Sequence, residues 1–360
     1  MIERGEMMEK STHILWDKGS AYDLFASLFI LHKPDQFGLR ASWAAGVRSR
    51  MPMHLRDSLE RAQRVLYVPL AWLHTLPEPK NAATVLEALA ALAPAERLPA
   101  LVFADKQDQR SVEYRNFLLS LDGKQRMTAR IEEQIKDYHI VMRSLSKDYL
   151  RATFEAWSER KKFGEDLLLA LEAYVVNFFE EDEIRIIPAQ AQALVKAQAL
   201  FQEKDLLSVL EELSAGVRMD WVEEVSTLIL APSFWGAPFF FFDKLDQETG
   251  IILFGARPEG TALVPGELIP DELLNALKAM ADPTRLRILY YLREEGPSTP
   301  SQLAKILRLR PPTVIHHIQN LRLAGLVSVT VSPKAERRYA LRMDGVDSTV
   351  QHLRAFLSGE

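Results

Sequence analysis

Apolar residues recur at helical spacing along most of the chain, so the sequence predicts a mainly helical protein. In residues 21–32 the residues Leu24, Phe25, Leu28 and Phe29 share one face of a helix. Comparable amphipathic stretches end at proline, glycine or capping residues. They lie at 39–50, 52–66, 82–92, 127–148, 149–162, 165–179, 188–200 and 204–214.

Three features in the middle of this region suggest where helices begin and end. Gly164 is expected to separate two helices, and Pro188 is expected to begin another, because proline fits the first helical turn. The acidic run 180–183 between them is interpreted as a solvated helix end.

Short β-type segments frame the helical region. Residues 12–17 suggest a strand, and the stretch from Val225 to Gly255 suggests two or three antiparallel strands, including an aromatic hairpin. Residues 258–266 are rich in proline and glycine and indicate a linker. We therefore expect an α-rich N-terminal domain over residues 1–265.

The last part of the chain predicts a winged helix-turn-helix domain over residues 266–360. Helices are expected from Asp271, over 284–293, from Thr299 and over 311–324. The period then changes from 3.6 to 2, which indicates a β-hairpin, the wing, over 327–341. The fold class expected is mostly α with small antiparallel β elements: a large α-rich N-terminal domain followed by a C-terminal winged helix-turn-helix.

The final helix has an apolar stripe with no evident partner inside so small a domain. Val346, Val350, Leu353 and Leu357 recur at i, i+4, i+7 and i+11. Such a stripe favours pairing with a second copy, so a homodimer is expected.

Composition narrows the function classes. The 360 residues include no cysteine, which excludes disulfides, thiolate metal sites and cysteine nucleophiles. No signal-peptide pattern begins the sequence, and no apolar run reaches the ~20 residues of a membrane span. We expect a cytoplasmic protein without a membrane partner.

Charge is unevenly distributed. Residues 302–342 carry eight Lys or Arg and one Glu, whereas residues 1–265 carry 31 basic and 39 acidic residues. A basic helix-turn-helix indicates double-stranded DNA as the partner, because the phosphate backbone attracts such a surface.

The spacing also selects DNA-contacting residues. Val314, Ile318 and Leu321 face inward, so the recognition helix 311–324 turns its polar side toward the major groove, and the wing lies on the DNA backbone. The candidate DNA-binding residues are Arg310, Thr313, His316, His317, Gln319, Asn320, Arg322, Lys334, Arg337 and Arg338.

The sequence has few signs of a metal site, a catalytic site or a ligand pocket. The eight histidines show no metal-ligand spacing, and no GxSxG, HExxH or P-loop motif occurs, so neither a metal, nor a cofactor, nor an enzyme is expected. The aromatic block around Trp235, Phe239 and Phe241 admits three interpretations: the lining of a ligand pocket, a buried strand packed on helices, or a protein or subunit contact.

The C-terminal residues resemble the ArsR family of bacterial winged-helix regulators. The resemblance is carried by Ala279–Leu289, Thr313–Ile318, Leu321–Val327 and the return strand Arg337–Tyr339. It implies a dimeric, repressor-type DNA-binding protein whose ligand changes its affinity for the operator.

The chain departs from this family in three places. Ser298, Thr299 and Ser301 stand near the position of the family's thiolate pair, and Asp347 and His352 do not reproduce the metal pattern of its last helix. Arg310 stands where the family usually has a serine-like cap. The residues before 266 resemble the uncharacterised α-rich domain fused to some ArsR-type regulators.

Together these patterns predict a transcriptional regulator that binds a pseudo-palindromic operator as a homodimer. Its N-terminal domain would sense a non-metal signal, with a small-molecule or a protein effector left open. In the alternative, the N-terminal domain is an enzyme or a protein-interaction module and the winged helix is an interaction platform.

Overall fold

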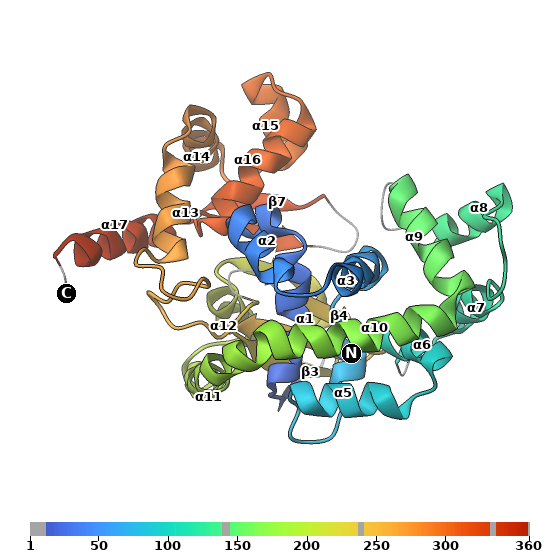
Figure 1. Cartoon of the computed structure of the whole chain (residues 1–360). Helices are drawn as coiled ribbons and strands as arrows, with labels where there is room; N and C mark the ends of the chain where they lie inside the picture. The colour runs from blue at the N-terminus through green and yellow to red at the C-terminus, as the bar shows by residue number, and fades with distance from the viewer. Residues whose placement is uncertain (1–11, 105, 139–144, 237–240, 332–335, 359–360) are drawn as a thin grey trace, which may run out of the picture.

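The computed structural model describes residues 12–104, 106–138, 145–236, 241–331 and 336–358 (Figure 1). It is mostly helical with two small sheets, so the predicted class is confirmed. The elements up to residue 138 are β1 (His13–Trp16), α1 (Ser20–Leu31), the 3-10 helix η1 (Pro34–Phe37), α2 (Ala41–Ser49), α3 (Met53–Val65), α4 (Leu70–His74), α5 (Ala82–Ala91), α6 (Pro94–Phe103), α7 (Gln109–Leu119) and α8 (Ala129–Tyr138).

The middle of the chain contains the longest helices and most of the first sheet. Its elements are α9 (Lys147–Ser158), α10 (Arg160–Tyr174), the π-helix η2 (Val175–Phe179), α11 (Glu180–Glu203), α12 (Leu206–Leu213), β2 (Val217–Met219), the 3-10 helix η3 (Asp220–Glu223), β3 (Thr227–Ser233), β4 (Phe241–Lys244) and β5 (Thr249–Gly255).

The first sheet has the order β1-β3-β5-β4, and its pairing corrects the sequence prediction. Strand β1 pairs parallel with β3, and β3 pairs parallel with β5; only the hairpin β4–β5 is antiparallel. The difference arises because β1 joins the sheet from more than 200 residues away, a partner that local patterning does not reveal. Alternation along the strands fills two cores, with Ile229 and Ile251 in one and Leu228 and Ile252 in the other.

Two predicted helix boundaries are wrong. α10 passes through Gly164 without a break, because the glycine serves close packing: a Cβ there would lie 1.9 Å from the carbonyl oxygen of Pro94. Likewise α11 begins at Glu180 and continues through the exposed Pro188. With η2 between them, α10 and α11 follow one another without an intervening loop. Figure 1 shows α10 running across the molecule toward α11.

The acidic run 180–183 is also not a solvated helix end. Asp182 is buried, with 4% of its surface exposed, and Glu183 accepts a hydrogen bond from the backbone N–H of Ala82 at 3.2 Å. The run begins α11, where negative side chains are favoured by the helix dipole, and it is held by neighbours from other elements.

The C-terminal part has the predicted helices and wing. Its elements are α13 (Asp271–Met280), α14 (Pro283–Glu295), α15 (Pro300–Leu307), α16 (Pro311–Leu323), β6 (Val327–Val331), β7 (Arg338–Leu341) and α17 (Met343–Ser358). β6 and β7 are antiparallel, as expected for a wing.

The wing sheet has a third strand from outside the predicted domain. β2 pairs parallel with β6, and the backbone N–H of Val329 donates to the carbonyl oxygen of Gly216 at 2.8 Å. The second core likewise includes Val217, Met219 and Trp221 together with Leu303 and Val314. The boundary at residue 265 stays a prediction, and strand pairing and core packing both cross it.

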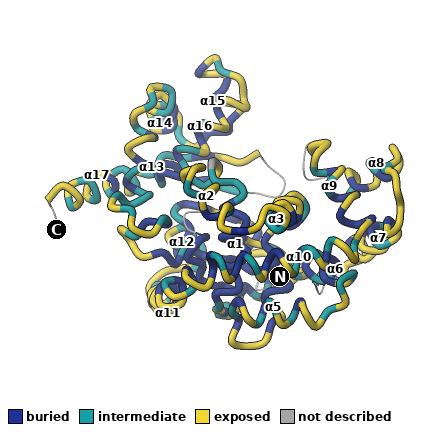
Figure 2. Tube along the Cα trace, in the orientation of Figure 1, coloured by how far each residue is buried: buried dark blue, intermediate teal, exposed yellow. Residues whose placement is uncertain are grey.

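Figure 2 shows how burial is distributed. The first sheet and its surrounding helices are mostly buried, whereas the outer surfaces of α15, α16 and α17 are exposed or half-buried. Among the described helices, none combines the length and the apolar character needed to cross a bilayer.

Candidate nucleic-acid interface

The turn between α15 and α16 is built by local capping and one left-handed residue. Thr299 and Gln302 form a reciprocal capping box at the start of α15. Arg308 ends α15 with φ 56°, a conformation that reverses the chain direction within a few residues. Arg310 precedes α16 without giving a side-chain cap, so its guanidinium is exposed beside the helix start.

One face of α16 is open to an incoming ligand. Val314, Ile318 and Leu321 are buried, as the spacing predicted. Thr313, His316 and Gln319, the residues on the opposite side, are exposed. This arrangement presents short hydrogen-bonding groups from the N-terminal part of a helix, the geometry used to read base edges in a major groove.

Two other candidates on α16 turn partly inward. Asn320 is half-buried, and its amide nitrogen donates to the carbonyl oxygen of His316 at 2.8 Å. His317 is half-buried with Nδ1 3.8 Å from Asp282 Oδ1, and burial lowers its pKa below the ordinary value despite this carboxylate. The ring is therefore held against the start of α14.

Arg322 lies on the side of α16 that faces the wing. Burial is the largest influence on its guanidinium and lowers its pKa, while its charge interacts with Tyr339 and Arg337. The half-buried side chain therefore joins the recognition helix to β7.

The base of the wing presents an exposed basic pair. Arg337 and Arg338 are both exposed, and Arg338 donates to the carbonyl oxygen of Pro297 at 3.5 Å. Ser301 on α15 donates to Glu336 at 2.7 Å, which ties the wing to the helix-turn-helix. Lys334 lies outside the described residues.

The structure adds Ile315 to the candidates on α16. Its side chain is 41% exposed although it is large and apolar. Position 315 falls outside the buried 314–318–321 stripe, so the helical period alone could have predicted that Ile315 is exposed. An exposed apolar side chain beside Thr313 and His316 is suited to contact a thymine methyl group.

The aromatic residues proposed for a ligand pocket are in the core. Trp235 is fully buried, stacks on Trp43 with ring centroids 6.3 Å apart and donates from Nε1 to Asp182 Oδ2 at 2.5 Å. Phe241 is 1% exposed and packs edge-on against Phe29. Both side chains therefore pack against helices in the core, as the interpretation of a buried aromatic segment expects. Phe239 lies outside the described residues.

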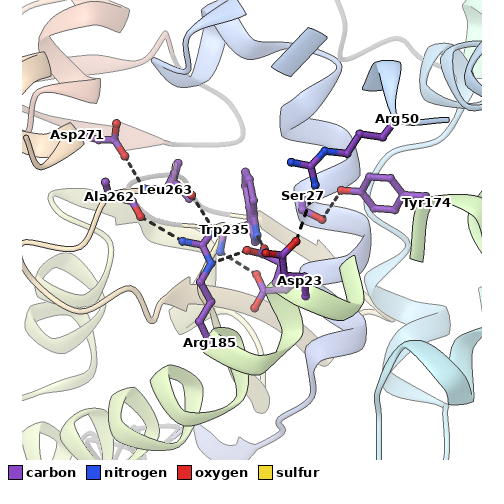
Figure 3. Close-up of polar contacts among 11 residues, drawn as sticks. Asp23, Ser27, Arg50, Tyr174, Arg185, Trp235, Ala262, Leu263 and Asp271 are labelled. Carbon is purple, nitrogen blue, oxygen red and sulfur yellow. Dashed lines mark hydrogen bonds and ion pairs between the residues drawn. The ribbon is translucent and has the colours of Figure 1, made fainter. Parts of the chain in front are cut away.

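A polar network that the sequence did not reveal connects this core to α13 (Figure 3). Asp182, which receives the Trp235 N–H, also pairs with Arg185 Nε at 2.5 Å. Arg185 donates to the carbonyl oxygens of Ala262 and Leu263 at 3.3 and 2.6 Å. The backbone N–H of Leu263 in turn donates to Asp271 Oδ2 at 2.6 Å, at the start of α13.

The capped turn between α15 and α16, the buried stripe of α16 and the antiparallel pair β6–β7 define a winged helix-turn-helix. Its recognition helix and wing base expose polar and basic groups. Residues 282–329 match the family model described as "Bacterial regulatory protein, arsR family". The match covers α14, α15, α16 and the start of β6, so the similarity to ArsR-type DNA-binding regulators lies in the helix-turn-helix, and the long N-terminal part is outside it. Comparison with curated proteins and with solved structures found no match.

Proposed function

We propose that the protein is a transcription regulator, and not an enzyme, that binds a pseudo-palindromic operator as a homodimer and represses transcription until its N-terminal part senses a non-metal effector. The observation that carries the proposal is the exposed face of α16 formed by Thr313, His316 and Gln319, with Arg310 just before the helix, within the segment that matches the ArsR family. Arg337 and Arg338 flank this face.

The two groups of residues have different roles. Guanidinium groups of the wing base bind phosphates and add affinity for any DNA sequence. The side chains of α16 reach the base edges and select the operator. Half-sites about one helical turn apart, ~34–36 Å, would fit a symmetric dimer.

The surface of α17 supports the homodimer. Val350, Phe356 and Leu357 are 44%, 43% and 74% exposed, and Thr349 is the one residue buried among those described in this helix. Apolar side chains left open along a helix that also packs on α13 favour association with a second copy. Sedimentation of the Val350→Glu, Leu357→Glu variant should give a monomer where the unmodified chain gives a dimer.

A gel shift with the protein's own promoter region tests DNA binding. Arg337→Ala with Arg338→Ala should weaken binding to all sequences and reduce the salt dependence, by a slope of roughly 1 for each phosphate that the variant no longer neutralises. The matched control is Arg115→Ala with Arg130→Ala, which removes two exposed arginines from α7 and α8.

Base selection is tested separately by His316→Ala with Gln319→Ala. This variant should relax the sequence preference while it retains binding to non-specific DNA. No shift at low salt, or equal losses in the wing variant and its control, would overturn the proposal and favour the interaction-platform alternative.

A further inference from the structure

A hollow of about 860 Å³ lies on the N-terminal part of the molecule. It is bounded by α3, α9, α10 and the turn after α7, and its volume lies within the ~300–1,000 Å³ usual for small-molecule sites. Its apolar surface comes from Met127, Phe154, Phe163 and Leu167. Phe154 and Leu167 are buried and fix the floor, while Met127 and Phe163 are half-buried.

The same hollow is lined by more cations than carboxylates. Two of the carboxylates are paired within the rim: Asp166 with Arg61 at 3.1 Å, and Glu155 with Arg151 at 2.7 Å. Lys124 and Lys162 are exposed and form no ion pair with any residue the structure describes. Arg64 pairs with Glu60 outside the lining at 2.9 Å, and the third lining carboxylate is the exposed Glu159. The two lysines therefore leave a small positive excess, in contrast with the acidic balance of residues 1–265.

From this combination we infer that the hollow binds an amphipathic anion. Its apolar body would lie against Phe154 and Phe163, and its anionic head group would contact the ammonium groups of Lys124 and Lys162. An apolar floor with a few charged groups at its rim selects for such a ligand over a neutral one of the same shape. That this anion is the effector of the regulator rests on the proposed function.

The position of the hollow connects it to the DNA-binding part. α10 forms one wall and continues through the π-helix η2 into α11, where Arg185 holds the backbone of residues 262–263 before α13. In Figure 1, α10 runs from the region of α7 and α9 toward α11, which lies next to α12. An occupant that moves α10 would therefore act on the continuous helical segment that holds the start of the winged helix.

Fluorescence titration of the full chain without DNA tests the site. The probes are 8-anilinonaphthalene-1-sulfonate, an aromatic anion, and N-phenyl-1-naphthylamine, its neutral counterpart. We expect Lys124→Gln with Lys162→Gln to weaken binding of the anion at least about tenfold, with little effect on the neutral probe. The matched control is Arg126→Gln with Lys161→Gln, which removes the same charge from neighbouring exposed positions that do not line the hollow.

A second variant tests the shape of the site. Ala152 lines the hollow and is half-buried, so Ala152→Trp should occupy part of the hollow and weaken binding of both probes. Equal affinity of the unmodified chain for the two probes, or an equal loss in the lysine variant and its control, would overturn the inference. If Ala152→Trp fails to fold, the lysine comparison decides alone. Because DNA is absent, a failure here is distinct from a failure of operator binding.

Discussion

Two helices of this molecule carry polar stripes and use them in opposite ways. On α16 the polar residues Thr313, His316 and Gln319 face outward. On α11 the polar residues Asp182 and Gln190 face inward. A polar helical stripe therefore indicates exposure only where no other part of the chain supplies its hydrogen-bond partners.

The inward stripe is possible because its partners are complete. Gln190 donates to Asp23 Oδ2 at 2.8 Å, and Asp23 also accepts from Ser233 Oγ at 2.6 Å and from the backbone N–H groups of Phe234 and Trp235 at 2.9 and 2.8 Å. Buried polar groups are tolerated when they are satisfied in this way. The network therefore fixes the turn after β3, whereas the outward stripe of α16 is left for a partner.

The largest expected effect comes from separating the two regions at residue 265. A fragment of residues 266–360 loses Val217, Met219 and Trp221 from the second core and leaves the β6 edge unpaired. Losing each large buried side chain costs about 2–5 kcal/mol, so the sum reaches the whole stability of a small domain. We expect no cooperative thermal transition by circular dichroism.

The full chain supplies the control for this experiment. Met219→Ala, which truncates one of the three side chains, should lower the free energy of unfolding by about 2–5 kcal/mol while the chain still unfolds cooperatively. A sharp transition of the 266–360 fragment, near that of the full chain, would show that the winged helix does not need β2.

The packing of α10 against α6 gives the next effect. Because a Cβ on Gly164 would lie 1.9 Å from the carbonyl oxygen of Pro94, Gly164→Ala must push α10 away from α6. We expect a loss of about 2–4 kcal/mol in urea unfolding. Gly46→Ala is the matched control: this helical glycine has nothing within 4 Å of an added Cβ, so it should stabilise by about 0.5–1 kcal/mol. Equal effects at the two positions would contradict close packing at Gly164.

The difference between the regions also decides what the sequence could predict. In the winged helix the determinants are local: the 314–318–321 stripe, the cap at Thr299 and the change to period 2 are read within a few residues. In the N-terminal part they are distant. Gly164 packs against Pro94, but in the sequence it resembles a helix break. Asp182 bonds Trp235, but in the sequence it resembles a solvated charge. β1 pairs with β3, but in the sequence it resembles a separate strand.

The pH dependence of stability tests the inward network. Burial raises the pKa of Asp23 to about 6, against the lowering influence of its hydrogen bonds. A raised pKa in the folded state means that this carboxyl stabilises the fold below about pH 4 and loses that contribution as pH rises through 6. The free energy of unfolding of the unmodified chain minus that of Asp23→Asn should fall by about 2 kcal/mol between pH 4 and 7.

Asp17 contributes to stability with the opposite pH dependence to Asp23. Its hydrogen bonds to His74, Lys80 and Tyr22 outweigh burial and lower its pKa to about 2. The contribution of Asp17 is present above about pH 4 and is lost as pH falls through 2. A difference between the unmodified chain and Asp23→Asn that stays constant from pH 4 to 7 would show that Asp23 is ionised throughout this range.

The smallest effect concerns neighbouring residues on α16 itself. Gln319 is exposed, whereas the amide of Asn320 is already bonded to the backbone of His316. If the outward stripe reads bases, Gln319→Ala should weaken operator binding by about 1–3 kcal/mol, measured by fluorescence anisotropy at fixed salt. Asn320→Ala should change it by less than about 0.5 kcal/mol, the usual range for residues outside such a contact. A larger effect for Asn320 would mean that the helix meets the groove along a face rotated by one residue, about 100°, from the one described.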